Sequence, residues 1–130
     1  MTRHGGWRTL GIVLAFGSGY DLVFGVAILG FTRVAARILG LQIPADPVYL
    51  YLNGAFLLVL AGLYAAAAHE PERYRAIAPI SAGGRTLGFL LFVWAWGGGR
   101  PATFLALGLA DLAIAIATIV AWRRAALLSD

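Results

Sequence analysis

The sequence predicts an all-α integral membrane protein: a four-helix bundle with a short outer interfacial helix between the first and second spans. Hydrophobic residues make up 61% of the 130-residue chain, whereas a soluble domain has roughly 45–50% apolar residues. Four apolar stretches, at residues 7–30, 48–68, 76–97 and 102–122, match the thickness of a bilayer core. They lack the alternation of barrel strands, so we expect helices, and we expect residues 1–130 to form a single four-span transmembrane domain.

The segment after the first span predicts a short helix that lies along the outer membrane surface. Its apolar residues recur at helical spacing, and two arginines four positions apart occupy another face. The apolar residues are Phe31, Val34, Ile38 and Leu41, and the arginines are Arg33 and Arg37. The connections at residues 69–75 and 97–101 are too short to hold an extramembrane domain.

The distribution of arginine predicts the orientation of the spans. Six arginines flank the spans on the side of the two termini, and three flank them on the opposite side. Because positive residues concentrate in cytoplasmic segments, we expect both termini in the cytoplasm and a multi-pass protein of a bacterial inner membrane. Trp7 and Trp122 then lie at the inner interface, with Trp94 and Trp96 near the outer one.

Four polar residues inside the spans are the candidate site: Asp21, Asn53, Arg85 and Asp111. Charges in a membrane are costly, so such residues usually face the bundle interior and find partners. Helical rise places both aspartates roughly 13 Å from the outer ends of their spans, Arg85 about 18 Å and Asn53 about 8 Å. We therefore expect Asp21, Arg85 and Asp111 to meet inside the bundle, with Asn53 nearer the outer mouth.

The formal charges of this cluster do not cancel. Two carboxylates and one guanidinium sum to −1, so a proton on one aspartate, a cation or another donor is needed to complete the site. A cluster that only fixes helix register needs no more than the proton. A ligand-binding or proton-handling site would use the same residues, with access from the outer face or laterally from lipid.

Other chemistry has little support in the sequence. There is no cysteine, and His4 and His69 have no companions at metal-ligand spacing, so we expect neither a metal site nor a cofactor. No phosphate-binding loop or catalytic triad is present. The arginines lie at span ends, where lipid and membrane topology account for them, so we expect no nucleic-acid partner.

Several motifs together resemble the small four-span bacterial membrane proteins of the DoxX-like type. They are Tyr20-Asp21-Leu22-Val23-Phe24-Gly25, the loop Ile43-Pro44-Ala45-Asp46-Pro47, Gly84-Arg85 and Ala110-Asp111-Leu112. The resemblance implies a four-helix membrane bundle, sometimes associated with redox or quinone-linked partners. It assigns no catalytic residue to this chain.

The sequence favours a non-enzymatic role over an enzymatic one, because no nucleophile or cofactor site accompanies the acids. Our first interpretation is a structural or accessory subunit of a membrane assembly, with the bilayer and a second copy or another membrane protein as partners. The alternative is a transporter or binder of a small ligand, a lipid or quinone, or a proton or cation. That alternative requires a cavity that reaches Asp21 and Asp111.

Overall fold

The computed structural model describes residues 3–128 and consists of five helices. These are α1 (Arg3–Gly30), α2 (Thr32–Leu39), α3 (Val48–His69), α4 (Ile77–Gly97) and α5 (Ala102–Leu127). All except α2 are long and apolar enough to cross a membrane. The prediction of an all-α, four-span membrane bundle is confirmed.

The helices differ from the predicted spans mainly at the two ends of the chain. α1 begins at Arg3 rather than at residue 7, and α5 continues to Leu127 rather than ending at Trp122. The predicted boundaries lie where hydropathy falls. A helix can continue past that point because its backbone hydrogen bonds are internal and do not depend on contact with lipid.

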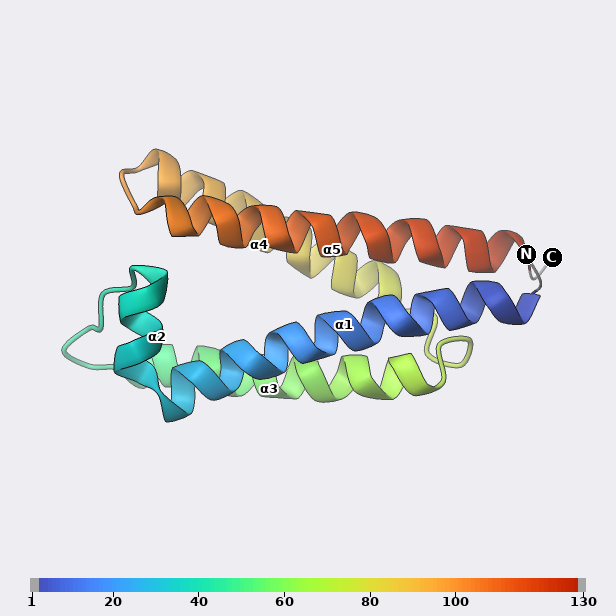
Figure 1. Cartoon of the computed structure of the whole chain (residues 1–130), viewed down its shortest axis with the longest axis horizontal. Coiled ribbons are helices and arrows are strands. Elements are labelled where there is room, and N and C mark those ends of the chain that lie inside the picture. The colour runs from blue at the N-terminus through green and yellow to red at the C-terminus, as the bar shows by residue number, and fades with distance from the viewer. Residues whose placement is uncertain (1–2, 129–130) are drawn as a thin grey trace.

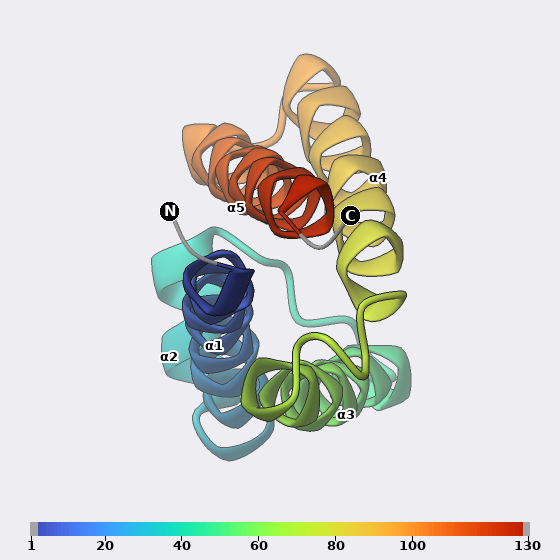
Figure 2. The same cartoon turned by 90° about the vertical axis from the view of Figure 1, so that its right-hand side faces the viewer.

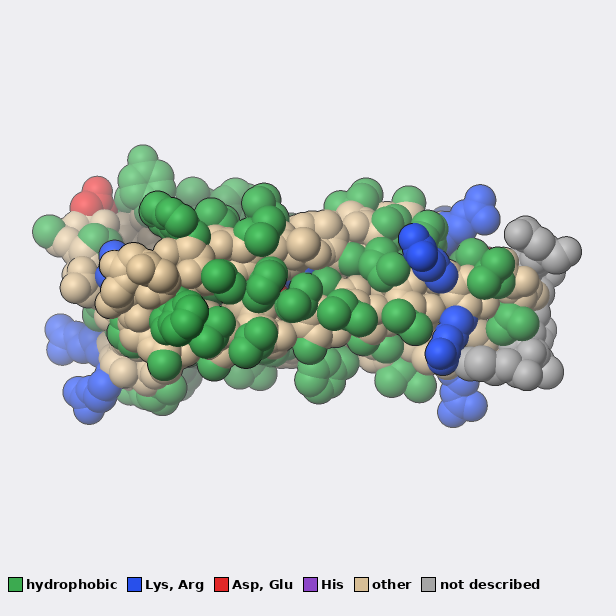
Figure 3. Space-filling view, turned by 90° about the horizontal axis from the view of Figure 1, so that it is seen from above, with side chains coloured by type: hydrophobic (Ala, Val, Ile, Leu, Met, Phe, Trp, Pro, Cys, Tyr) green, Lys and Arg blue, Asp and Glu red, His purple; other side chains and the backbone are tan. Residues whose placement is uncertain are grey.

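The long helices run up and down, so the start of α1 and the end of α5 lie at one end of the molecule and α2 at the other (Figure 1). We call these the termini end and the α2 end. Arginine side chains gather at both ends, and hydrophobic side chains cover the surface between them (Figure 3). This banded surface is the one expected of a protein that spans a bilayer.

The short helix α2 packs its small residues inward and turns its large apolar residues outward. Ala35 and Ala36 are buried, whereas Phe31, Val34 and Ile38 are exposed. At the α2 end of a membrane protein, these exposed side chains would face lipid. The predicted short helix between the first and second spans is therefore present, at residues 32–39.

Helix packing is uneven around the bundle. α1 packs along both α3 and α5, and α4 packs along α5, but α3 and α4 form no extensive contact in the described part of the chain. Figures 1 and 2 show α3 and α4 diverging toward the α2 end. The bundle is therefore closed on three sides and loosely closed on the fourth.

The apolar core lies at the termini end, where α1 approaches α3 and α5 closely. It contains Trp7, Leu10 and Leu14 of α1, Ala67 of α3, Ala78 of α4, and Ala121 and Ala125 of α5. A Cβ atom on Gly6 would lie 2.9 Å from the Cα of Ala125, and one on Gly11 would lie 2.8 Å from the carbonyl oxygen of Ala68. Small residues thus let the backbones meet, as is usual in membrane bundles.

Candidate functional site

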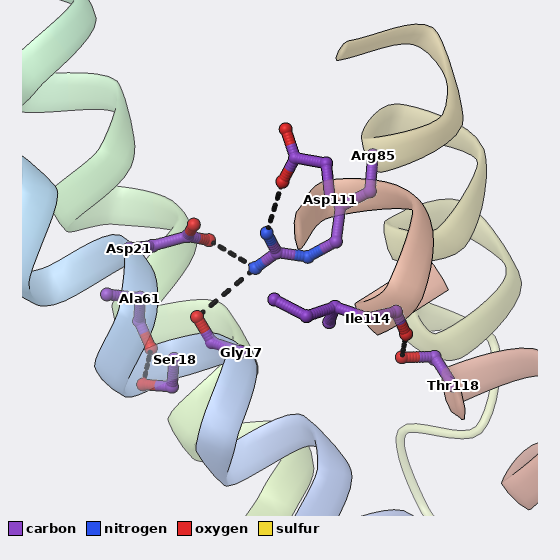
Figure 4. A network of polar contacts seen from close by, with 8 residues as sticks. All are labelled: Gly17, Ser18, Asp21, Ala61, Arg85, Asp111, Ile114 and Thr118. Atoms are coloured by element: carbon purple, nitrogen blue, oxygen red, sulfur yellow. Dashed lines mark hydrogen bonds and ion pairs between the residues drawn. The ribbon is translucent and has the colours of Figure 1, made fainter. Parts of the chain in front are cut away.

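The predicted meeting of Asp21, Arg85 and Asp111 is confirmed. One terminal nitrogen of Arg85 (Nη1) donates to Oδ1 of Asp111 at 2.9 Å, and the other (Nη2) donates to Oδ2 of Asp21 at 3.0 Å. The three side chains come from α4, α5 and α1 and converge on one point of the bundle interior (Figure 4). The three charged residues in the middle of the spans thus form one buried cluster.

The guanidinium is also held by groups that the sequence did not single out. Nη2 of Arg85 donates to the carbonyl oxygen of Gly17 at 3.1 Å. A Cβ atom on Gly17 would lie 3.2 Å from this nitrogen, so a small residue at position 17 allows the contact. The rings of Tyr20 and Tyr64 each have their centroid 5.5 Å from Cζ of Arg85, within the range of a cation–π interaction.

Two signals could have identified these neighbours. Tyr20 and Tyr64 are tyrosines within the spans rather than at the membrane interfaces, where aromatic residues are enriched. Gly17 lies one helical turn before Asp21, on the same face of α1. Tyr64 contacts the cluster because α3 packs against α1, and local sequence does not specify that packing.

Burial differs across the cluster. The side chains of Arg85 and Asp21 are 6% and 5% exposed, whereas that of Asp111 is 14% exposed. Arg85 Nε is buried without a hydrogen-bond partner. The second oxygen of each carboxylate points away from the guanidinium (Figure 4) and has no hydrogen-bond partner among the described residues.

A cavity of about 590 Å³ adjoins the cluster. Its wall includes Asp21, Arg85 and Asp111, together with leucines and aromatic residues from α1, α3, α4 and α5. Asn53 also lines this cavity, but it is exposed and makes no hydrogen bond with the cluster. The structure thus brings three of the four predicted residues into contact and places the fourth elsewhere on the same cavity wall.

The opening of the cavity lies between α3 and α4. The cavity-lining residues with exposed side chains are on these two helices, among them Leu60, Ile80 and Leu91, which are 36%, 73% and 58% exposed. Those of α1 and α5, such as Ile28 and Leu107, are buried or half-buried. In a bilayer this opening would face the lipid tails.

The α2 end of the cavity is covered by the chain that leaves α2. Leu39 and Leu41 lie in the cavity wall, and Thr103 of α5 donates its hydroxyl to the carbonyl oxygen of Leu39 at 2.7 Å. Gly40 between them has φ +67°, and a Cβ atom there would lie 2.8 Å from the ring of Pro101. Glycine allows both this left-handed backbone and the close contact. Residues 39–41, which we call the cover of the cavity, therefore pack directly against the start of α5.

Outside the spans, Arg73 and Glu70 form an exposed ion pair. Arg73 donates to Glu70 at 3.1 Å in the connection between α3 and α4, and this hydrogen bond raises the pKa of Arg73. No cluster of three potential metal ligands occurs among the described residues. The polar chemistry within the spans is thus concentrated at the Asp21–Arg85–Asp111 cluster.

No protein-family model, curated protein or solved structure matches this chain. The resemblance to DoxX-like proteins therefore stays a prediction, and the site has to be interpreted from its own geometry.

Proposed function

We propose that the protein binds a small, mostly apolar molecule from the bilayer and holds its polar head at the Asp21–Arg85–Asp111 cluster. The observation that carries this proposal is that the cluster forms part of the wall of the 590 Å³ cavity. Ligand sites are typically apolar cavities of roughly 300–1,000 Å³ with a few polar groups that fix orientation. Between the two roles left open by the sequence, this geometry favours the ligand-binding role.

A purely structural role explains only some of the observations. The cluster ties α4 and α5 to α1, as a register-fixing core would. Such a core has no use for two carboxylate oxygens without partners or for a cavity beside them. A structural or accessory subunit nevertheless remains the competing proposal, with a second copy or another membrane protein as its partner.

Entry from the lipid follows from where the cavity opens. The cover formed by Leu39 and Leu41 lies between the cavity and the α2 end, whereas the exposed lining residues lie between α3 and α4. We place the protein in a bacterial inner membrane with both termini in the cytoplasm, on the basis of its arginine distribution. The ligand would then enter laterally, with its apolar body among the leucines.

Filling the cavity without disturbing the bundle tests this proposal. Gly84 lines the cavity, and a Cβ atom there meets nothing within 4 Å. Gly83 is equally open but does not line the cavity, so Gly83→Leu is a matched control for Gly84→Leu. The probe is 1-naphthylmethanol, a neutral amphipathic molecule, measured by equilibrium dialysis against nanodiscs with empty nanodiscs subtracted.

We expect saturable binding to the wild type and to Gly83→Leu, and at least a tenfold loss of affinity in Gly84→Leu. Equal binding by the two variants, or no binding above empty nanodiscs, would overturn the proposal. A stable complex of the purified protein with one stoichiometric membrane protein, without probe binding, would support the accessory subunit instead.

A further inference from the structure

We propose that the ligand carries a cationic donor head, such as a protonated amine, which binds the free carboxylate oxygens of Asp21 and Asp111. This inference rests on the proposed function and names its class of ligand. It starts from the hydrogen-bonding capacity that the cluster still has after its internal contacts are made.

The two carboxylates of the cluster keep unused acceptors in the wall of the cavity. Each carboxylate gives one oxygen to Arg85 and keeps the other free. Arg85 has both terminal nitrogens bound to the two carboxylates, which leaves one N–H of Nη1 without a hydrogen-bond partner among the described residues, and its unpartnered Nε is too buried to reach a molecule in the cavity. A ligand head that binds these two carboxylate oxygens must be a donor, whereas the other donors on the same wall, Asn53 and the hydroxyls of Tyr20 and Tyr64, lie outside the ion-paired cluster.

The charge of the site favours the same class of ligand. Asp21, Arg85 and Asp111 sum to a formal −1, and no other charged side chain among the described residues lines the cavity. A cation would neutralise this excess in a medium that screens charge poorly. An anion would add a third negative charge beside the two carboxylates.

A quinone head fits these groups less well than an amine does. Its carbonyl oxygens only accept hydrogen bonds, so it offers nothing to two free carboxylate oxygens. It can accept hydrogen bonds from Asn53 or from the hydroxyls of Tyr20 and Tyr64, but it would bind the carboxylates themselves only if a proton on one aspartate supplied the donor. The choice between amine and quinone thus depends on whether a cation or a proton completes the cluster.

The remaining wall requires an apolar body. Leu57 and Leu60 of α3 and Leu91 of α4 lie around the cavity and its opening. A small hydrated cation such as Na⁺ would have to cross lipid to reach this opening. A lipophilic amine has both the apolar body that can enter and the head that the cluster can bind.

Four probes that share a naphthalene ring separate these possibilities. They are 1-naphthylmethylammonium, 1-naphthylmethanol, 1,4-naphthoquinone and 1-naphthoate, measured at pH 7 on the wild type in zwitterionic nanodiscs. We expect the ammonium probe to bind at least tenfold more tightly than the alcohol, and the quinone and carboxylate to bind more weakly than the alcohol.

The outcomes distinguish the two proposals. If none of the probes binds, the proposed function fails. If the alcohol binds and is excluded by Gly84→Leu, but the quinone or the carboxylate binds as tightly as the ammonium, the proposed function stands and this inference is wrong. An equal affinity for ammonium and alcohol would also contradict the inference.

A charge variant adds a second test. Asp111 is the more accessible carboxylate, so Asp111→Asn should abolish the tenfold preference for the ammonium probe over the alcohol. Asp46→Asn is the control, because Asp46 is exposed in the loop before α3 and does not line the cavity. An unchanged preference in Asp111→Asn would overturn the inference, and if that variant does not fold, the wild-type probe series decides alone.

Discussion

The two halves of the bundle are built from the same helices but packed differently. At the termini end, leucines, alanines and close glycine contacts fill the interior, and Leu10 is fully buried. Toward the α2 end, α3 and α4 diverge, and the interior contains a cavity with the polar cluster in its wall. The termini half therefore contributes most of the packing stability. The α2 half keeps an open cavity and has fewer contacts between its helices.

Removal of Arg85 should have the largest effect on stability. Arg85→Met leaves two carboxylates in the bundle without a counter-charge, and breaking a buried ion pair in this way costs about 3–5 kcal/mol. The free energy of unfolding in mixed micelles, measured by titration with SDS, should fall by that amount. In Arg73→Met, which breaks an exposed pair that solvent screens, we expect no measurable change.

A triple variant tests the cause of that loss. Arg85→Met combined with Asp21→Asn and Asp111→Asn removes all the formal charge of the cluster and should recover most of the lost stability. If it does not, the cost of Arg85→Met comes from lost packing rather than from unpaired charge.

Leucine truncation compares the two halves directly. Leu10→Ala creates a void in a filled interior and should cost about 2–4 kcal/mol. Leu57 is half-buried and borders the cavity, so it has fewer contacts to lose and Leu57→Ala should cost clearly less than Leu10→Ala. Equal losses in the same SDS titration would show that the α2 half is as tightly packed as the termini half.

Glycine substitution gives a smaller contrast. Gly6→Ala places a methyl group 2.9 Å from the backbone of α5, and overpacking of this kind costs about 1–3 kcal/mol. Gly19→Ala meets nothing within 4 Å and should leave stability unchanged or slightly higher. Thermal unfolding followed by circular dichroism is sufficient to rank the two variants.

The smallest effects should come from single hydrogen bonds between helices. Ser18 donates to the carbonyl oxygen of Ala61 at 2.7 Å, and such a bond in a membrane protein contributes about 0.6 kcal/mol on average. Ser18→Ala should lose about that amount. Thr103→Val should lose a similar amount and also increase hydrogen exchange at Leu41, whose amide lies in the cover of the cavity.

Most of the fold could be predicted because membrane spans are encoded locally. The starts at Val48 and Ala102 and the ends at Gly30 and Gly97 agree with the structure, since each coincides with a change in hydropathy or with a glycine-rich turn. The cluster could be predicted because an intramembrane charge needs a partner and helical rise gives its depth.

The cavity could not be predicted, because it depends on which helices pack together. Asp21 and Arg85 identify the interior faces of α1 and α4, but nothing local in the sequence indicates that α3 and α4 diverge. The depth of Asn53 in the membrane follows from its position along its span. Its separation from the cluster depends on where α3 packs in the bundle, which the sequence does not give. The sequence therefore predicts the polar cluster, whereas the cavity beside it enters only as a requirement of the ligand-binding interpretation.

The most direct test of the central claim is to map where a bilayer-borne molecule contacts the protein. A diazirine derivative of 1-naphthylmethanol, photoactivated in nanodiscs and located by mass spectrometry, should label Leu57, Leu60 and Leu91, and excess unlabelled probe should suppress that labelling. Labelling of Ile12 and Phe16, which are exposed but do not line the cavity, should be weaker and insensitive to competition. Uniform labelling of both sets, with no competition at the leucines, would contradict the claim that the cavity is a binding site.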